Sequence, residues 1–282
     1  MLASRLPSIL PNLTFEESLE ITKIHSIAGT LPPNIPLVTK RPFRNPHHTI
    51  SNSALVGGGK IPKPGEISLA HYGVLFLDEI PEFRRDVLEL LREPLEDGKI
   101  TICRVQSALT YPSKFMLIAS MNPCPCGYYG AKDKVCVCTS DQISKYINKI
   151  SGPLLDRIDI HIEVQPIKFD ALSSNRPIES SKDIKERVNK ARDIQVQRYK
   201  DDKIYCNSGL NPDLIKKYCF LDDESKNLLK NAFEKFGLSA RAHDKILKLA
   251  RTIADLDNKK NIEASHIAEA IRYRTLDRKY WN

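Results

Sequence analysis

Two adjacent carboxylates, Asp78 and Glu79, directly follow a short apolar run at 74–77. Such a run, bounded by Gly73 and Pro81, is typical of a strand that is buried on both faces of a parallel sheet. Open parallel sheets bind ligands beyond the carboxyl ends of their strands, which is where these acids lie. An aspartate there can hold Mg²⁺, and the adjacent glutamate can orient or deprotonate an attacking water.

A second buried strand, expected at 115–119, is followed by Asn122 in the segment FMLIASMN. An asparagine amide on a neighbouring strand can position a water molecule or a phosphate oxygen. Two apolar strands that each end in polar side chains therefore indicate one shared site. The alternative is that Asp78 and Glu79 only cap the helix that follows them, because acids favour a helix N-terminus.

The phosphate-binding loop that such a site would use, G-x-x-x-x-G-K-[ST], does not occur in these 282 residues. The segment GGGK at 57–60 has Ala54 where the pattern needs glycine and Ile61 where it needs a hydroxyl. The other Gly-Lys pair, at 98–99, fails the same test.

Four of the seven cysteines form a C-x-C-x₉-C-x-C pattern, namely Cys124, Cys126, Cys136 and Cys138. Tetrahedral zinc takes four thiolates, and two short cysteine pairs on a glycine-containing loop can converge on one ion. Neither pair has the C-x₂-C spacing of common zinc knuckles. The pattern favours a structural zinc site, and the alternative is four reduced cysteines in a surface turn.

The chain carries 43 basic and 35 acidic residues, a net charge of +8 that permits contact with nucleic acid without requiring it. No apolar stretch approaches the ~20 residues of a membrane span, and the first residues do not read as a secretion signal. We therefore expect a cytoplasmic protein that makes no membrane contact and keeps its thiols reduced.

The order of the expected elements predicts an α/β core at 1–168 and a small helical domain at 169–282. In the core we expect a hairpin within 54–67, the strand 74–77, one helix at 84–98, alternating strands within 99–112, the strand 115–119, a helix at 140–149 and a strand at 158–164. In the second part we expect helices near 182–199, 222–236, 240–256 and 263–274.

Four segments together resemble the ComM (YifB) group of Mg-chelatase-like AAA+ ATPases: RPFRNPHHTISNSALVGGG, PGEISLAHYGVLFLDEIPEF, NPCPCGYYG and GPLLDRIDIHIEV. The resemblance covers nearly the whole chain and implies a partial AAA+ parallel-sheet core without its P-loop strand, followed by a helical lid domain. In that family a phosphate loop precedes a segment similar to MLASRLPSILP. We therefore expect the Lon-protease-like domain, first core strand and phosphate loop to be missing upstream of Met1, as in a cloned fragment, an internal start or a split gene.

The resemblance implies a role for each strand-end residue. Asp78 and Glu79 match the Walker B pair, with Asp78 on Mg²⁺ and Glu79 activating water. Asn122 matches sensor 1. Mg²⁺ and ATP are therefore the cofactors that the family implies for this site.

Two arginines gain roles only from the resemblance. Arg157, in LLDRID, matches the arginine finger that reaches the nucleotide of a neighbouring subunit, and its alternative is a salt bridge to Asp156 or Asp159. Arg241, in GLSARAHDKIL, matches sensor 2 of the lid, and its alternative is a solvated surface arginine. A finger acting between subunits implies a homohexameric ring.

The family's task is ATP-driven translocation on DNA, with branch migration during recombination in natural transformation. Two hairpin segments, GGGKIPKP and KITICRV, resemble the family's DNA-facing inserts. They carry Lys60, Lys63, Lys99 and Arg104, which could contact phosphates or could be ordinary solvated side chains.

Other functions remain open from the sequence. One is a non-catalytic remnant that binds DNA or a partner but not ATP, and another is a metal-chelatase motor subunit. A chain without a phosphate loop could also pair with an upstream polypeptide that supplies it.

Overall fold

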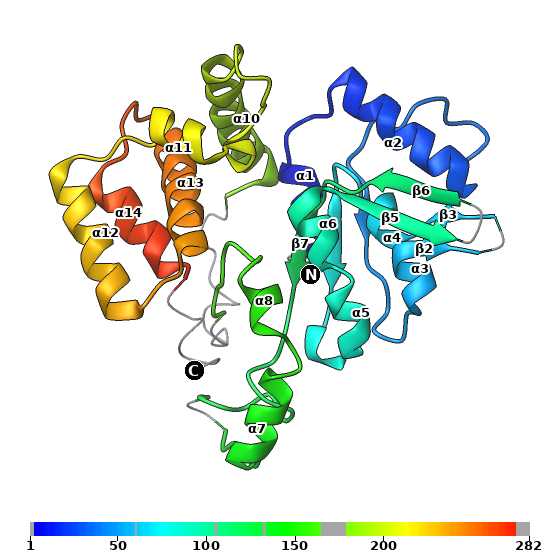
Figure 1. Cartoon of the computed structure of the whole chain (residues 1–282), viewed down its shortest axis with the longest axis horizontal. Coiled ribbons are helices and arrows are strands. Elements are labelled where there is room, and N and C mark those ends of the chain that lie inside the picture. The colour runs from blue at the N-terminus through cyan, green and yellow to red at the C-terminus, as the bar shows by residue number, and fades with distance from the viewer. Residues whose placement is uncertain (1–2, 60, 105–106, 132–133, 165–178, 275–282) are drawn as a thin grey trace. The chain divides into compact units, whose positions relative to one another are not determined.

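The computed structural model describes residues 3–59, 61–104, 107–131, 134–164 and 179–274 (Figure 1). The chain divides into two compact units. Unit 1 comprises Met1–Pro7 and Asn12–Arg157, and unit 2 comprises Ser8–Pro11 and Ile158–Asn282. The domain boundary expected at 168/169 lies outside the described residues.

The centre of unit 1 is a three-stranded parallel sheet in the order β1-β4-β7, formed by Phe43–Arg44, Val74–Leu77 and Met116–Ala119. The strand expected at 74–77 is confirmed as the central strand β4. Its residues Val74, Leu75 and Leu77 are at most 1% exposed, as expected of a strand with neighbours on both sides. Close approach of β1 requires Gly73, because a Cβ there would lie 2.1 Å from the Pro42 carbonyl oxygen.

The expectation that the second apolar strand is also buried is wrong for β7. Met116 is 45% exposed and the other three residues of β7 are half-buried. Among the described residues β7 pairs only with β4, so it forms an edge of the sheet. An edge strand leaves one side uncovered, which a local hydrophobic pattern cannot reveal.

The other elements of unit 1, to which only Leu6 and Pro7 of α1 belong, are helices and two hairpins. They are η1 (Ala3–Arg5), α1 (Leu6–Ile9), α2 (Phe15–Ala28), α3 (Asn52–Val56), α4 (Glu66–Leu69), η2 (Ile80–Glu82), α5 (Arg85–Glu89), α6 (Arg92–Asp97), α7 (Ser140–Ile147) and α8 (Gly152–Leu155), with the hairpins β2–β3 (Gly57–Gly58, Lys63–Pro64) and β5–β6 (Lys99–Arg104, Ser107–Pro112). The expected helix at 84–98 is thus two short helices. Pro94 explains the break, because it cannot donate a hydrogen bond to the carbonyl of residue 90.

The two hairpins contact each other. The Tyr111 hydroxyl donates a 2.9 Å hydrogen bond to the Pro62 carbonyl oxygen. Gly57 leaves no room for a side chain, since a Cβ there would lie 2.8 Å from the Ile102 side chain. The inserts expected from the sequence therefore form one packed pair.

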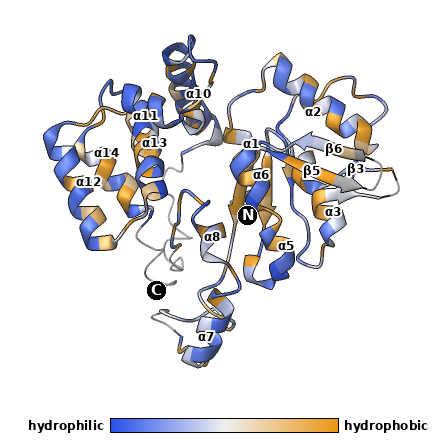
Figure 2. Ribbon diagram, viewed as in Figure 1, coloured by the Kyte–Doolittle hydropathy of each residue, from blue (hydrophilic) through white to orange (hydrophobic). Residues whose placement is uncertain are grey.

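Unit 2 is helical, as the sequence predicts. Its elements are α10 (Ser181–Arg198), η3 (Asn207–Gly209), α11 (Pro212–Tyr218), α12 (Asp223–Phe236), α13 (Ala240–Leu256) and α14 (Ala264–Arg272). Figure 2 shows hydrophilic and hydrophobic residues side by side on α12, α13 and α14, as in amphipathic helices that bury one face. The core includes the fully buried Ile246, Ala250 and Ile267.

The strand expected at 158–164 does not form. Its alternating apolar residues Ile160, Ile162 and Val164 are 42%, 67% and 74% exposed. His161 instead donates its backbone N–H to the carbonyl of Tyr273. An alternating pattern becomes a strand only beside another strand, and the described part of the chain offers none here.

None of the described helices is long and apolar enough to cross a membrane.

Candidate functional site

The acidic pair lies where β4 ends, beside the end of β7. Leu77 pairs with Ala119, so the next residues, Asp78 and Ser120, are adjacent. The Ser120 hydroxyl donates a hydrogen bond to Oδ1 of Asp78. The backbone N–H of Glu79 lies 3.1 Å from the same carboxylate oxygen and 3.3 Å from the Ser120 hydroxyl oxygen. These contacts hold the turn while both acidic side chains remain exposed.

Glu79 has a left-handed backbone, with φ 52° and ψ 50°. This conformation is uncommon for residues other than glycine and is retained mainly where the surrounding structure enforces it. Here the next residue enforces it, because Ile80 donates its N–H to the Ser120 carbonyl oxygen at 2.9 Å. The alternative that the acids cap the next helix is not supported, since Glu79 makes no side-chain capping bond to η2.

Asn122 is exposed and lies three residues beyond the end of β7, at the same carboxyl end of the sheet as the acids. Tyr146, a residue of α7 that is only 6% exposed, lies near the Asn122 backbone. Burial, followed by the negative charge of Glu82, raises the pKa of Tyr146, and Glu79 contributes in the same direction. The acids, Asn122 and Tyr146 therefore share one neighbourhood.

Sequence reasoning missed Ser120 and Tyr146. Ser120 could have been found by aligning the ends of the two apolar runs, because it is the residue directly after the second one. Tyr146 carries no local signal, since it approaches the site through the packing of α7.

Arg157 is mostly buried, with 14% of its side chain exposed. It forms a salt bridge with Glu96, and its Nη1 donates to the Pro153 carbonyl oxygen at 2.7 Å. Glu96 was not expected as a partner. The sequence suggested Asp156 or Asp159 as the partner, but Asp159 forms its salt bridge with Lys245, at 2.7 Å.

The other candidates lie elsewhere. Arg241 is an exposed residue in the first turn of α13, in unit 2. Lys63 and Lys99 are exposed on β3 and β5 of the paired hairpins. Lys60 and the side chain of Arg104 lie outside what the structure describes.

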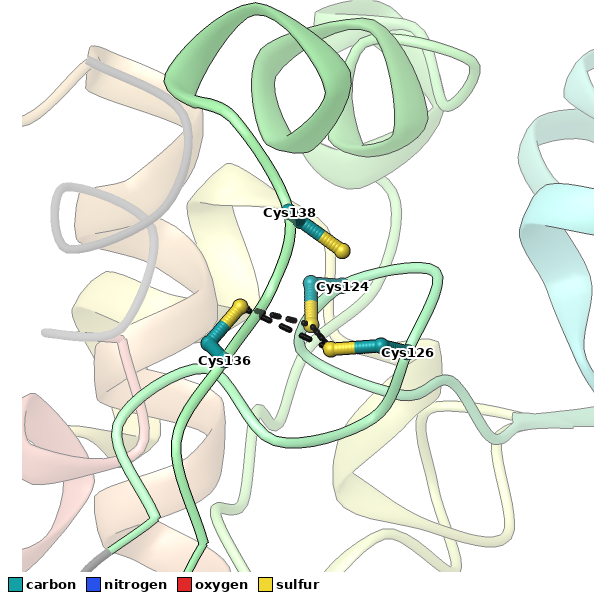
Figure 3. A group of neighbouring side chains, drawn as sticks. All are labelled: Cys124, Cys126, Cys136 and Cys138. Carbon is teal, nitrogen blue, oxygen red and sulfur yellow. Dashed lines mark hydrogen bonds between the residues drawn. The ribbon is translucent and has the colours of Figure 1, made fainter.

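The cysteine cluster is compact. Figure 3 shows the four sulfur atoms converging from two segments of one loop, and all of them lie within 4.8 Å of one another. The Sγ of Cys124 lies 3.3 Å from that of Cys126 and 3.7 Å from that of Cys136. Tetrahedral thiolate ligands, ~2.3 Å from a zinc ion, are ~3.8 Å apart, so this set could hold a metal ion.

The loop backbone prepares the cluster for binding. Gly127 and Gly130 have φ of 81° and 78°, which lets the loop turn back between the cysteine pairs. The N–H groups of Tyr128 and Val137 lower the pKa of the Cys126 thiol to about 6. The Cys126 thiol is therefore mainly thiolate at neutral pH, which is the form that binds metals. Against the Cys138 N–H, burial and the neighbouring thiols raise the pKa of Cys136 to about 12, so in the metal-free cluster this thiol keeps its proton.

Comparison with known proteins finds two matching family models. Magnesium chelatase, subunit ChlI, matches residues 1–172, and the C-terminal part of the same subunit matches residues 178–274. The chain is 45% identical over 284 residues to the uncharacterized protein YifB of Escherichia coli, covering 99% of this chain and 54% of that protein. It is 46% identical over 280 residues to the competence protein ComM of Haemophilus influenzae, covering 99% and 53%.

A more distant relative is the magnesium-chelatase subunit ChlI of Bigelowiella natans, 26% identical over 126 residues, which covers 45% of this chain and 28% of that protein. The chain spans about half the length of YifB and ComM.

The strained backbone of Glu79 leads to a prediction about stability. Glu79→Gly should leave the free energy of unfolding unchanged or raise it, because glycine relieves about 1–2 kcal/mol of left-handed strain against a smaller entropic cost. Glu82→Gly, in the adjacent η2 turn, should lower it by about 0.5–1 kcal/mol. Urea unfolding of both variants checks this, and equal destabilisation would show that position 79 is not strained.

Proposed function

This chain belongs to the magnesium-chelatase ChlI family. On that premise we propose that it contains the catalytic acids and the lid domain of a ComM-type ATPase that moves along DNA. The observation that carries the proposal is the turn at the end of β4. There Ser120 holds the exposed Asp78 carboxylate and the backbone N–H of Glu79, at the carboxyl end of a parallel sheet. This is where such sheets bind nucleotides.

In this proposal each residue has one task. Asp78, oriented by Ser120, offers a carboxylate oxygen to Mg²⁺, and Glu79 orients or deprotonates the attacking water. Asn122 positions the water or a phosphate oxygen. Bound Mg²⁺ would neutralise charge that develops on the transferred phosphoryl group.

Arg157 is proposed as the arginine finger of a homohexameric ring. Its salt bridge with Glu96 compensates a charge that is largely buried within this chain. To act on a neighbour's nucleotide, Arg157 would leave Glu96 and bind phosphate oxygens instead. Its charge would then still be compensated by an anion. Arg241 is proposed as sensor 2 on the exposed start of α13.

The paired hairpins are proposed as the DNA-facing surface. Lys63 and Lys99 are exposed on hairpins that the Tyr111–Pro62 hydrogen bond holds together, and the net charge of the chain is +8. Lysines on a fixed support can follow a phosphate backbone without reading its sequence. The proposed task is branch migration of recombining strands during transformation, in the cytoplasm.

One observation favours a second candidate. These 282 residues contain no G-x-x-x-x-G-K-[ST] segment, so this polypeptide could bind DNA or a partner without using ATP. An upstream polypeptide carrying the loop could restore activity by adding a strand at the exposed edge β7. The metal-chelatase alternative has less support, since the match to ChlI of Bigelowiella natans covers less of the chain at lower identity.

Nucleotide binding separates the two candidates. The 282-residue chain should bind ATP-Mg²⁺ weakly or not at all in a calorimetric titration. A chimera with the upstream half of YifB placed before Met1 should bind and hydrolyse ATP. In that chimera Glu79→Gln should lower turnover by about 100-fold or more while ATP still binds.

The matched control is Glu82→Gln, an exposed acid of the same turn, which should leave turnover nearly unchanged. Tight ATP binding by the 282-residue chain, or full activity of the Glu79→Gln chimera, would contradict the proposal.

DNA binding is expected to depend on the hairpin lysines. Replacing both Lys63 and Lys99 by alanine should weaken binding to duplex DNA and reduce the slope of log K against log salt by about 1 per lysine. The control replaces Lys226 and Lys230, which are exposed on α12. Fluorescence anisotropy over a salt series measures the DNA affinity of both double variants. Equal loss of affinity in the two would argue against the hairpins as the DNA-binding surface.

The cysteine cluster is proposed to bind one structural Zn²⁺. Metal analysis of the purified chain should find about one zinc per chain, because four convergent thiolates complete a closed tetrahedral site. Changing Cys124 and Cys136 to serine should abolish binding, whereas Cys206→Ser should not. A zinc content near zero in the unaltered, reduced chain would rule the site out.

A further inference from the structure

Three of the four clustered sulfur atoms form a close triangle. The Sγ of Cys126 lies 3.3 Å from that of Cys124 and 3.5 Å from that of Cys136. Cys124 and Cys136 are 3.7 Å apart, and Figure 3 shows the three sulfur atoms facing one another. The S–S bond of a disulfide is about 2.05 Å long. A movement of about 1.5 Å would therefore join Cys126 to either of its neighbours.

Solvent reaches these sulfur atoms unequally. Cys124 is fully buried, and its Sγ accepts a backbone N–H of the loop at 3.3 Å. Cys126 and Cys136 are only half-buried. The segment around Cys136 is open to solvent, since the flanking Val135 and Val137 are 87% and 81% exposed. Oxidation of cysteine follows exposure, so a small oxidant reaches Cys126 and Cys136 more readily than Cys124.

The loop favours a disulfide across the two cysteine pairs over one within a pair. Cys126 and Cys136 are ten positions apart in the sequence, so their bond would close a loop whose ends already meet. The separation of Cys124 and Cys126 is slightly shorter, but their bond needs the buried sulfur atom. It must also fit a dihedral angle of about 90° into a ring of three residues, and departures from that geometry store strain.

We propose that Cys126 and Cys136 are a modification site that hydroperoxides convert from two thiols to one disulfide. Hydrogen peroxide transfers an oxygen atom to one thiol, which gives a sulfenic acid and one water. The second thiol attacks that sulfur, so that an S–S bond forms and the S–O bond breaks. The departing hydroxide leaves as a second water with the proton of the attacking thiol. Two thiols are thus oxidised and one peroxide is reduced.

The disulfide removes two of the four candidate metal ligands. Metals bind the thiolate form of cysteine, and Cys124 and Cys138 alone do not complete a closed tetrahedral site. A bound zinc ion is therefore released on oxidation, and a thiol reductant restores the site by exchange with the disulfide. The release of zinc rests on the proposed metal site, whereas formation of the disulfide does not.

Peptide mapping of the whole chain tests the pairing. Trypsin cleaves after Lys134, which separates the first cysteine pair from the second. After the reduced, zinc-loaded chain is treated with hydrogen peroxide, the two peptides should be joined and two of the seven cysteines should resist alkylation. Zinc should be released in proportion, and dithiothreitol should reverse both changes. Loss of two thiols with the peptides unjoined, sulfinic acid on Cys126, or a disulfide between two chains would overturn the proposal.

Two variants, compared as metal-free, reduced chains, identify the thiol that reacts. Cys126→Ser should slow formation of the joined peptides by about 10-fold or more, because the remaining close neighbour of Cys136 is buried. Cys138→Ser is the matched control and should react at the rate of the unaltered chain. Equal rates in the two variants would overturn the role of Cys126. A purified chain that binds no zinc would contradict the metal site alone, because this comparison needs no metal.

Discussion

The register of β4 with β7 is the constraint on which the candidate site depends. Parallel strands that end in register place the residues after them side by side, and here Leu77 opposite Ala119 makes Asp78 a neighbour of Ser120. A shift of one residue would turn the Ser120 hydroxyl to the opposite face. Both the orientation of the carboxylate and the left-handed turn at Glu79 follow from this pairing.

The site combines exposed side chains with a fixed backbone. Asp78 and Glu79 are open to solvent, so they avoid the desolvation cost that would accompany buried carboxylates. The hydrogen bonds that Ser120 makes to the turn limit how far they can move. This arrangement suits groups that must bind a hydrated cation and activate water, because a preorganised site needs little rearrangement during the reaction.

The cysteine loop and the helical unit show two ways in which the chain gains order. Unit 2 buries Ile246, Ala250 and Ile267 in a conventional core, and a buried network of Arg198, Arg251 and Asp255 ties α10 to α13. The cysteine loop leaves its valines exposed and brings four sulfur atoms together instead. Where little apolar surface is available, metal ligands can replace a core.

The sequence by itself determined the central strand β4, its acidic end, the four longer helices of unit 2 (α10, α12, α13 and α14), the cysteine pairs and the family. Each of these features depends on residues that are close in the sequence, as an apolar run, a helical periodicity, a short spacing or a motif. Only the tertiary structure decided that Ser120 contacts Asp78, that Arg157 pairs with Glu96 and that α7 brings Tyr146 near the acids. It also decided that β7 is an edge and that 158–164 is not a strand. These outcomes depend on which segments lie beside one another, and residues far apart in the sequence carry no local record of that pairing.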